Sequence, residues 1–137
     1  MIVWLPQAMA ADNAIKMAYN FTTVSQNVVF NSAMQSGGTL QLSAQVKDGG
    51  GRNPGDPFTM KLVFYNSSNA VVSTVQQAYT LTLGAAATTY SVTATDCGGS
   101  CANVTYVSVQ FYGKDGGYWA GNYGPQIQSP SLSYNGG

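Results

Sequence analysis

A strict alternation of apolar and polar residues along two neighbouring stretches constrains the fold more than any other feature of the sequence. Every second residue of 39–46 is apolar, namely Leu40, Leu42, Ala44 and Val46. The same period recurs in 58–65, where the apolar set is Phe58, Met60, Leu62 and Phe64. Successive side chains of a β-strand point to opposite faces of its sheet, so each stretch predicts a strand with one buried face.

Similar short runs, separated by Gly, Pro, Asn and Ser, continue through the chain. They predict about eight strands, at 24–30, 39–46, 58–65, 70–77, 79–83, 88–95, 104–112 and 130–134. No helical stretch lies between them to carry a crossover to a parallel neighbour. The pattern therefore predicts an all-β fold, an antiparallel two-sheet β-sandwich of the jelly-roll type, as one domain over residues 22–137.

Residues 1–21 differ from the rest and predict an N-terminal arm or a short helix. Apolar residues recur at helical spacing between Leu5 and Tyr19, as they do along one face of a helix. An alternative interpretation is the remnant of a signal-peptidase site, because Ala8-Met9-Ala10 has the required small residues. No stretch approaches the roughly 18 consecutive apolar residues of a membrane span, and none is expected.

The scarcity of charge excludes several classes of function. Five Lys or Arg and five Asp are the only charged residues, and the net charge is zero. A chain of this length usually carries about 34 charged residues. Without a basic excess we expect neither nucleic-acid binding nor adhesion to an anionic membrane. Without His or Glu there is no Ser/His or Cys/His pair, and the Asp residues fall mostly in predicted turns, so we expect no enzyme and no cofactor.

Two short segments have the composition of specialised loops. Cys97 and Cys101 are separated by two glycines and a serine, and they predict a disulfide ring in the turn after the strand at 88–95. The Gly-rich loop 48–56 offers oxygen ligands at Asp48, Asn53 and Asp56 for a possible Ca²⁺ ion. The same residues are also typical of a hydrated hairpin loop, so the calcium interpretation has a structural alternative.

Near the C-terminus, the segment 111–125 carries a motif of glycines and aromatic residues. It runs from a predicted strand into Gly-x-Asp, a Tyr-Trp pair and x-Gly-x-Tyr-Gly, with the matching positions Gly113, Asp115, Tyr118, Trp119, Gly121, Tyr123 and Gly124. This motif resembles the C-terminal signature of the F-box-associated domains of sugar-recognising F-box proteins, which are galactose-binding-like jelly rolls. The clear match covers about 20 residues.

The resemblance implies that Tyr118 and Trp119 contact sugars, because the aromatic pair has that role in the glycan-binding members. Two differences from the glycan-binding members of the family limit what the resemblance implies. No F-box precedes the sandwich in this sequence, so no ubiquitin-ligase role is expected. The lysine that follows the Trp in glycan-binding members is Ala120 here, which removes one polar contact and leaves the aromatic pair.

The chemistry of the same residues is also compatible with sugar binding. Sugars stack their apolar C–H faces on aromatic rings and direct their hydroxyls to amides and carboxylates. Asp115, Asn122 and Gln126 would supply those polar groups. The alternative is structural: Trp119 would fill the end of the sandwich between its glycines, and Asp115 would accept hydrogen bonds from its own loop.

Two hypotheses of function follow from these observations. The first is a non-catalytic, lectin-like carbohydrate-binding module whose partner is a glycan. The second is a structural subunit of an exterior assembly, such as a virion decoration, tail or fibre protein or an extracellular filament. Such a subunit would pack as a homo-oligomer, or against virion or filament neighbours, through its N-terminal arm and uncharged β faces. Both hypotheses place the protein outside the cell or on a virion surface.

Overall fold

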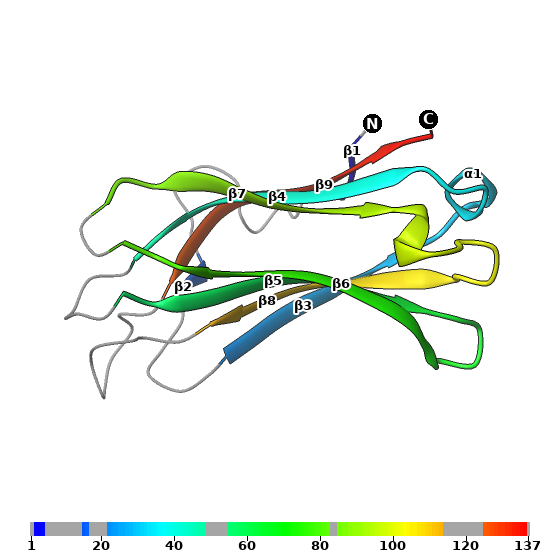
Figure 1. The fold of residues 1–137 in the computed structure, drawn as a ribbon, viewed down its shortest axis with the longest axis horizontal. Coiled ribbons are helices and arrows are strands. Elements are labelled where there is room, and N and C mark those ends of the chain that lie inside the picture. Colours follow the sequence, from blue (N-terminus) through cyan, green and yellow to red (C-terminus); the bar gives the residue numbers. More distant parts are fainter. Residues whose placement is uncertain are drawn as a thin grey trace.

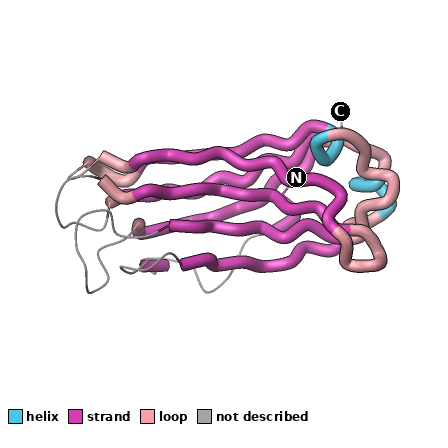
Figure 2. The backbone as a smooth tube through the Cα atoms, turned by 60° about the horizontal axis from the view of Figure 1, so that its bottom comes forward, coloured by secondary structure: helices cyan, strands magenta, loops and turns pink. Residues whose placement is uncertain are grey.

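The computed structural model describes residues 2–4, 15–16, 22–48, 55–82, 85–113 and 125–136. These residues form a sandwich of two antiparallel sheets (Figures 1 and 2). Sheet A has the order β1-β9-β4-β7, with β2 also paired to β9, and sheet B has the order β3-β8-β5-β6. The strands are β1 (Ile2–Trp4), β2 (Ile15–Lys16), β3 (Thr22–Val29), β4 (Thr39–Lys47), β5 (Pro57–Tyr65), β6 (Val71–Thr80), β7 (Thr88–Thr95), β8 (Tyr106–Gly113) and β9 (Gln126–Asn135).

The connections between these strands are those of a jelly roll. From β3 to β9 only β5 and β6 follow one another within a sheet, and every other step of the chain crosses from one sheet to the other. All pairings in both sheets are antiparallel. The predicted all-β, two-sheet fold is therefore confirmed.

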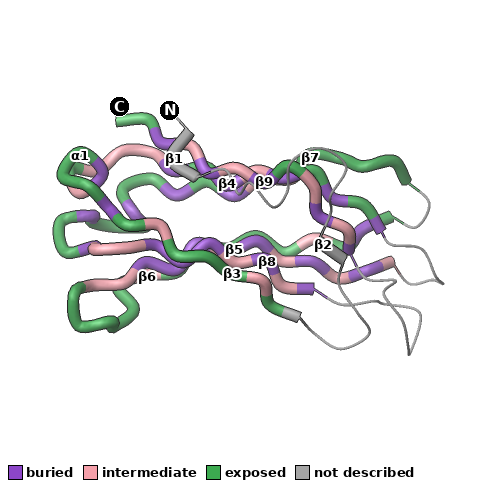
Figure 3. Tube along the Cα trace, turned by 180° about the vertical axis from the view of Figure 1, so that it is seen from behind, coloured by how far each residue is buried: buried purple, intermediate pink, exposed green. Residues whose placement is uncertain are grey.

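The core lies between the sheets and is built from the alternating apolar residues. The four inward residues of β4 and the four of β5 are all buried, each at most 4% exposed. Figure 3 shows buried segments alternating with more exposed ones along the strands. Phe58 of β5 stacks on Phe111 of β8 with ring centroids 6.1 Å apart. Burying such residues supplies the main force for folding, about 25 cal/mol for each Å² of apolar surface.

Three sequence predictions differ from the structure. The strands expected at 70–77 and 79–83 are one continuous strand, β6, which lies at the edge of sheet B. The last strand begins earlier than expected, at Gln126, and continues past a bulge near Ser129 and through Pro130. The helix expected between Leu5 and Tyr19 is wrong at Ile15 and Lys16, because they pair with β9 as β2. The other residues of that expected helix lie outside the described ranges.

The two ends of the sandwich differ. At the end that we call the disulfide end lie the Cys97–Cys101 segment and a four-residue helix, α1 (Ser32–Gln35), capped by the side chain of Asn31. At the opposite end, the loop end, β4, β6 and β8 finish and β3, β5, β7 and β9 begin. No helix in the described part of the chain has the length and apolar character needed to span a membrane.

Candidate functional site

The segment with the predicted sugar-binding residues connects to the loop end of the sandwich. β8 ends there at Gly113, and β9 begins there at Gln126. Asp115, Tyr118, Trp119 and Asn122 lie outside the described residues, so their roles stay predictions. Gln126 is the member of the predicted set that the structure places.

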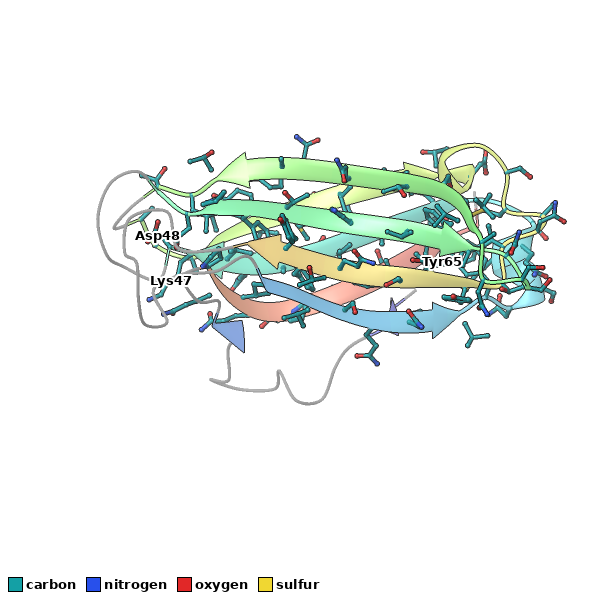
Figure 4. The ribbon with its side chains drawn as sticks, turned by 90° about the horizontal axis from the view of Figure 1, so that it is seen from below. Lys47, Asp48 and Tyr65 are labelled. Carbon is teal, nitrogen blue, oxygen red and sulfur yellow. A yellow bond between two sulfur atoms is a disulfide. The ribbon has the colours of Figure 1, made fainter. Side chains whose placement is uncertain are left out.

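Gln126 occupies the outer face of sheet A at the loop end. Its neighbour Ile127 is fully buried, so Gln126 points to the opposite side of the sheet. It pairs in register with Lys47 of β4 and, on its other side, with Lys16 of β2. Lys47 is exposed, and Figure 4 shows it next to Asp48, at the end opposite Tyr65. The Gln126 amide and the Lys47 ammonium group are therefore neighbours at the start of β9, the strand that follows the aromatic motif.

Asp48 and Asp56 close the base of the Gly-rich loop, and both are buried, at 7% and 1% exposed. The Asp56 backbone N–H donates to Oδ2 of Asp48 at 2.9 Å. The Leu81 N–H donates to the Asp56 carbonyl, also at 2.9 Å. Gly55 packs so closely on the Leu81 carbonyl that a Cβ atom would overlap it. These contacts give Asp48, Gly55 and Asp56 a structural role in joining the start of β5 to the end of β6.

The calcium interpretation of this loop stays a prediction. Asn53 lies outside the described residues, whereas Asp48 and Asp56 lie next to each other as that interpretation requires. Among the residues that the structure describes, no group of three or more His, Cys, Asp or Glu side chains could hold a metal ion. One oxygen of Asp48 is engaged by the Asp56 N–H, so calcium would need the other oxygen and further ligands from the loop.

The predicted disulfide is confirmed. Cys97 and Cys101 are bonded, with Cα atoms 5.3 Å apart. Both are buried in the core, at 2% and 5% exposed. They lie between β7 and β8, which belong to different sheets, so the ring sits in a crossing between sheets. The Ser73 hydroxyl of β6 donates to the carbonyl oxygen of Cys97, which fixes the ring to sheet B.

A second aromatic feature, absent from the sequence predictions, lies on the outer face of sheet B. Tyr65 and Tyr106 stack with centroids 4.8 Å apart and ring planes 8° apart. They are opposite each other in the β5–β8 register, and Val29 and Val71 continue the same row on β3 and β6. Only the strand register brings these four residues together, and no spacing in the sequence reveals that register.

Two open, polar depressions are found at the disulfide end. One, of about 370 Å³, is lined by Thr39, Gln41, Ser133, Tyr134 and Asn135. The other, of about 280 Å³, is lined by Gln35, Ser36, Gly37, Asp96, Gly99, Ser100, Cys101 and Ala102. They are small and polar compared with most ligand pockets, which are largely apolar. Neither includes a residue predicted to bind sugar.

Comparison with known proteins identifies the fold and no family. The sequence matches no protein-family profile and no curated protein. Three solved structures match over most of this chain. A chain in the structure of infectious bursal disease virus Gt strain has a TM-score of 0.63 and 14% identity, and the match covers 90% of this chain and 29% of that one. The enzymatically active domain of bacteriophage CBA120 tailspike protein 4 has a TM-score of 0.57 and 11% identity, covering 84% and 14%.

The third is the CBM22-1–GH10 part of the Clostridium thermocellum endo-1,4-beta-D-xylanase 10B, with a TM-score of 0.46 and 8% identity, covering 80% of this chain and 19% of that one. This chain therefore spans less than a third of each of these proteins. At such low identity, the first two matches establish the β-sandwich and nothing finer.

Proposed function

We propose that the protein is a non-catalytic carbohydrate-binding module that binds a glycan at the loop end of its sandwich. The observation that supports this best is the position of the motif 113–124. It leaves β8 and returns to β9 where Gln126 and Lys47 stand side by side on the outer face of sheet A. In this proposal a sugar on the Tyr118–Trp119 pair is also bonded by these hydrogen-bond donors.

The contact proposed for each residue follows from the chemistry of sugars. The rings of Tyr118 and Trp119 would stack on the apolar C–H face of one sugar. Asp115, Asn122 and Gln126 would bond its hydroxyls, as the few polar groups of a binding site usually do. The resemblance to the F-box-associated domains supports the aromatic pair alone, and the polar partners rest on the chemistry of this chain.

The described carboxylates support a role without catalysis. Glycoside hydrolysis usually requires two carboxyl groups across a cleft, about 5 to 10 Å apart. Asp48 accepts a hydrogen bond from the Asp56 N–H, and Asp96 accepts one from the Gly38 N–H at 2.9 Å. These side chains hold turns together. We accordingly assign the module no reaction and no cofactor.

The buried disulfide supports a location outside the cell or on a virion surface. Disulfides persist in oxidising compartments and are rare in the cytosol. Cys97 and Cys101 are bonded and belong to the core. A glycan-binding module has its partners in the same places.

A glycan array followed by calorimetry tests the proposal. The wild type should bind at least one class of glycan. Trp119→Ala and Tyr118→Ala should each weaken binding by up to about tenfold, since an aromatic stacking contact is worth roughly 0.5 to 1.5 kcal/mol. Gln126→Ala should weaken it less. Gln41→Ala is the matched control, because Gln41 is exposed on the same face of sheet A but near the disulfide end. Absence of any wild-type binding, or unchanged binding by Trp119→Ala, would contradict the proposal.

The second candidate, a structural subunit of an exterior assembly, is favoured by the outer face of sheet A. Along β4 and β7 its outward residues are uncharged except for Lys47: Thr39, Gln41, Ser43, Gln45, Thr89, Ser91, Thr93 and Thr95. The two stronger structural matches belong to a virus and a phage tailspike protein. β1 and β2 pair with β9 of the same chain, so such packing would use the β faces or edges more than the arm. Sedimentation over a range of concentrations tests this candidate, and a monomer at every concentration would contradict it.

A further inference from the structure

The free edges of the two sheets are protected to different degrees. At one edge of sheet A, β9 pairs with the short strands β1 and β2, and it carries a bulge near Ser129 and a proline at Pro130. Short strands, bulges, prolines and lysines are the devices that keep sheet edges from pairing with other chains. This edge has the first three of them, and Lys16 of β2 supplies the fourth.

The strands on the opposite side of the sandwich have fewer of these devices, namely one bulge in β6 at Val72, near the disulfide end. There β6 is the edge of sheet B and β7 the edge of sheet A, and among the described strands each pairs with one neighbour only. Neither strand contains a charged residue or a proline. Both edges face the viewer in Figure 1. Unpaired N–H and C=O groups in such a strand are a template for another strand.

Side-chain contacts between the sheets hold these two edges in place. The Tyr79 hydroxyl of β6 donates to the Ser91 carbonyl of β7 at 2.6 Å, and its ring lies 4.6 Å from the ring of Tyr90. At the disulfide end Ser73 is bonded to Cys97. The side formed by β6 and β7 is therefore a fixed surface, so a partner would bind it with little cost of ordering.

We infer that β6 pairs with β6 of a second copy of this chain, antiparallel, about a two-fold axis at Val75. This register places Thr74 opposite Gln76 and Ser73 opposite Gln77. From Ser73 to Gln77 it keeps the outward residues of both copies on one face, as the period of a strand requires. Val71 and Val72, which are 57% and 41% exposed, lie at the bulge of β6 and would flank this paired stretch.

Neighbouring registers match less well. An axis at Thr74 would place Val75 opposite Ser73, and an axis at Gln76 would place it opposite Gln77. Of these three, only the axis at Val75 pairs polar residues with one another throughout the stretch from Ser73 to Gln77 and places Val75 against its own copy. Because β6 carries no charge, this self-pairing places no like charges opposite each other.

The size of this side agrees with a stable homodimer. At about 3.3 Å per residue, the ten residues of β6 extend about 33 Å. Two sheets about 10 Å apart, with their backbones, are about 20 Å thick. The product of this length and thickness is an area of roughly 650 Å² per copy, close to the ~800 Å² that each partner buries in a standard interface. The loop end, where we place the sugar site, is the short side of the sandwich and stays open in this arrangement.

Sedimentation of the full chain tests the pairing, with two matched variants. Thr74 of β6 and Asn27 of β3 are both exposed, and they lie in the same cross-strand row on opposite edges of sheet B. The wild type should form a dimer at high micromolar concentration. Thr74→Lys should weaken the dimer about tenfold or more, because it would place two like charges close together across the two-fold axis. Asn27→Lys should leave it unchanged.

A cross-linking experiment tests the register. The double variant Thr74→Cys, Gln76→Cys should form a covalent dimer under mild oxidation, because each new cysteine at position 74 would face the one at position 76 of the second copy. Thr74→Cys alone and Gln76→Cys alone should not, since neither cysteine would face its own counterpart. Circular dichroism of each variant serves as the control for correct folding. The inference would be overturned if the wild type stayed monomeric. It would also be overturned if Thr74→Lys left the dimer intact, or if only Asn27→Lys weakened it.

Discussion

Asp48 provides the sharpest test of how the loop end is held together. Replacing it by alanine removes a carboxylate that accepts the Asp56 N–H at 2.9 Å inside the protein. A hydrogen bond to a charged group contributes about 1.5 to 3 kcal/mol, and a buried donor that loses its acceptor adds to the cost of the substitution. We therefore expect Asp48→Ala to lower the free energy of unfolding by about 2 kcal/mol.

The corresponding shift in melting temperature follows from the length of the chain. With about 2.1 cal/mol/K per residue, the 137 residues have an unfolding entropy near 0.29 kcal/mol/K. A loss of about 2 kcal/mol then lowers the melting temperature by about 7 °C. Asp48→Asn keeps an oxygen acceptor without its charge, so we expect about half that shift. Thermal unfolding followed by circular dichroism, with the disulfide intact, measures both.

The same assay separates the two interpretations of the loop. If Asp48 only closes the loop, adding calcium or a chelator should leave the melting temperature of the wild type unchanged. If calcium instead raises the melting temperature of the wild type and Asp48→Ala abolishes that rise, the result would support a metal site. An Asp48→Ala variant that melts within about 1 °C of the wild type would refute the proposed role of the hydrogen bond.

Three further substitutions test the other contacts by the same melting assay. Replacing Cys97 and Cys101 by serine opens a five-residue ring, which should cost about 2 kcal/mol, or about 7 °C; an unchanged melting temperature would contradict this. Tyr134→Phe removes a hydroxyl that lies 2.8 Å from two backbone carbonyls at the α1 end, and should cost about 1 to 2 kcal/mol unless those carbonyls find water. Gly55→Ala places a methyl group on the Leu81 carbonyl and should cost about 1 to 3 kcal/mol; a loss near zero would show that the turn adapts.

The fold could be predicted because its strands repeat one pattern. In β4 and β5 every second residue is apolar and faces the core, so the period of two indicated both the strand and its buried face. The pattern weakens in β6, where most residues are exposed, and there the prediction broke one strand into two. At Ile15 an apolar spacing typical of a helix belongs to a residue that pairs with β9. Pairing with distant residues determined the structure at that point, and local spacing does not reveal it.

The site could be predicted only in part. The disulfide followed from the two cysteines and their spacing, and the structure confirms it. The burial of Asp48 and Asp56 was not foreseen, because a loop rich in glycine and aspartate usually lies in water. The Tyr65–Tyr106 stack depends on the register of two strands 40 residues apart along the chain. Register is set by the whole sheet, so no local motif indicates it.

The pairing of β1 with β9 has a practical consequence for how the molecule can be attached to a surface. Ile2 lies opposite Ser133, so the first and last described strands run side by side near the disulfide end (Figure 1). An anchor or a fused tag joined at either terminus would attach the sandwich near its disulfide end, so that the loop end is directed away from the support. Copies tethered in this way would present Gln126 and Lys47 to soluble sugars in one common orientation.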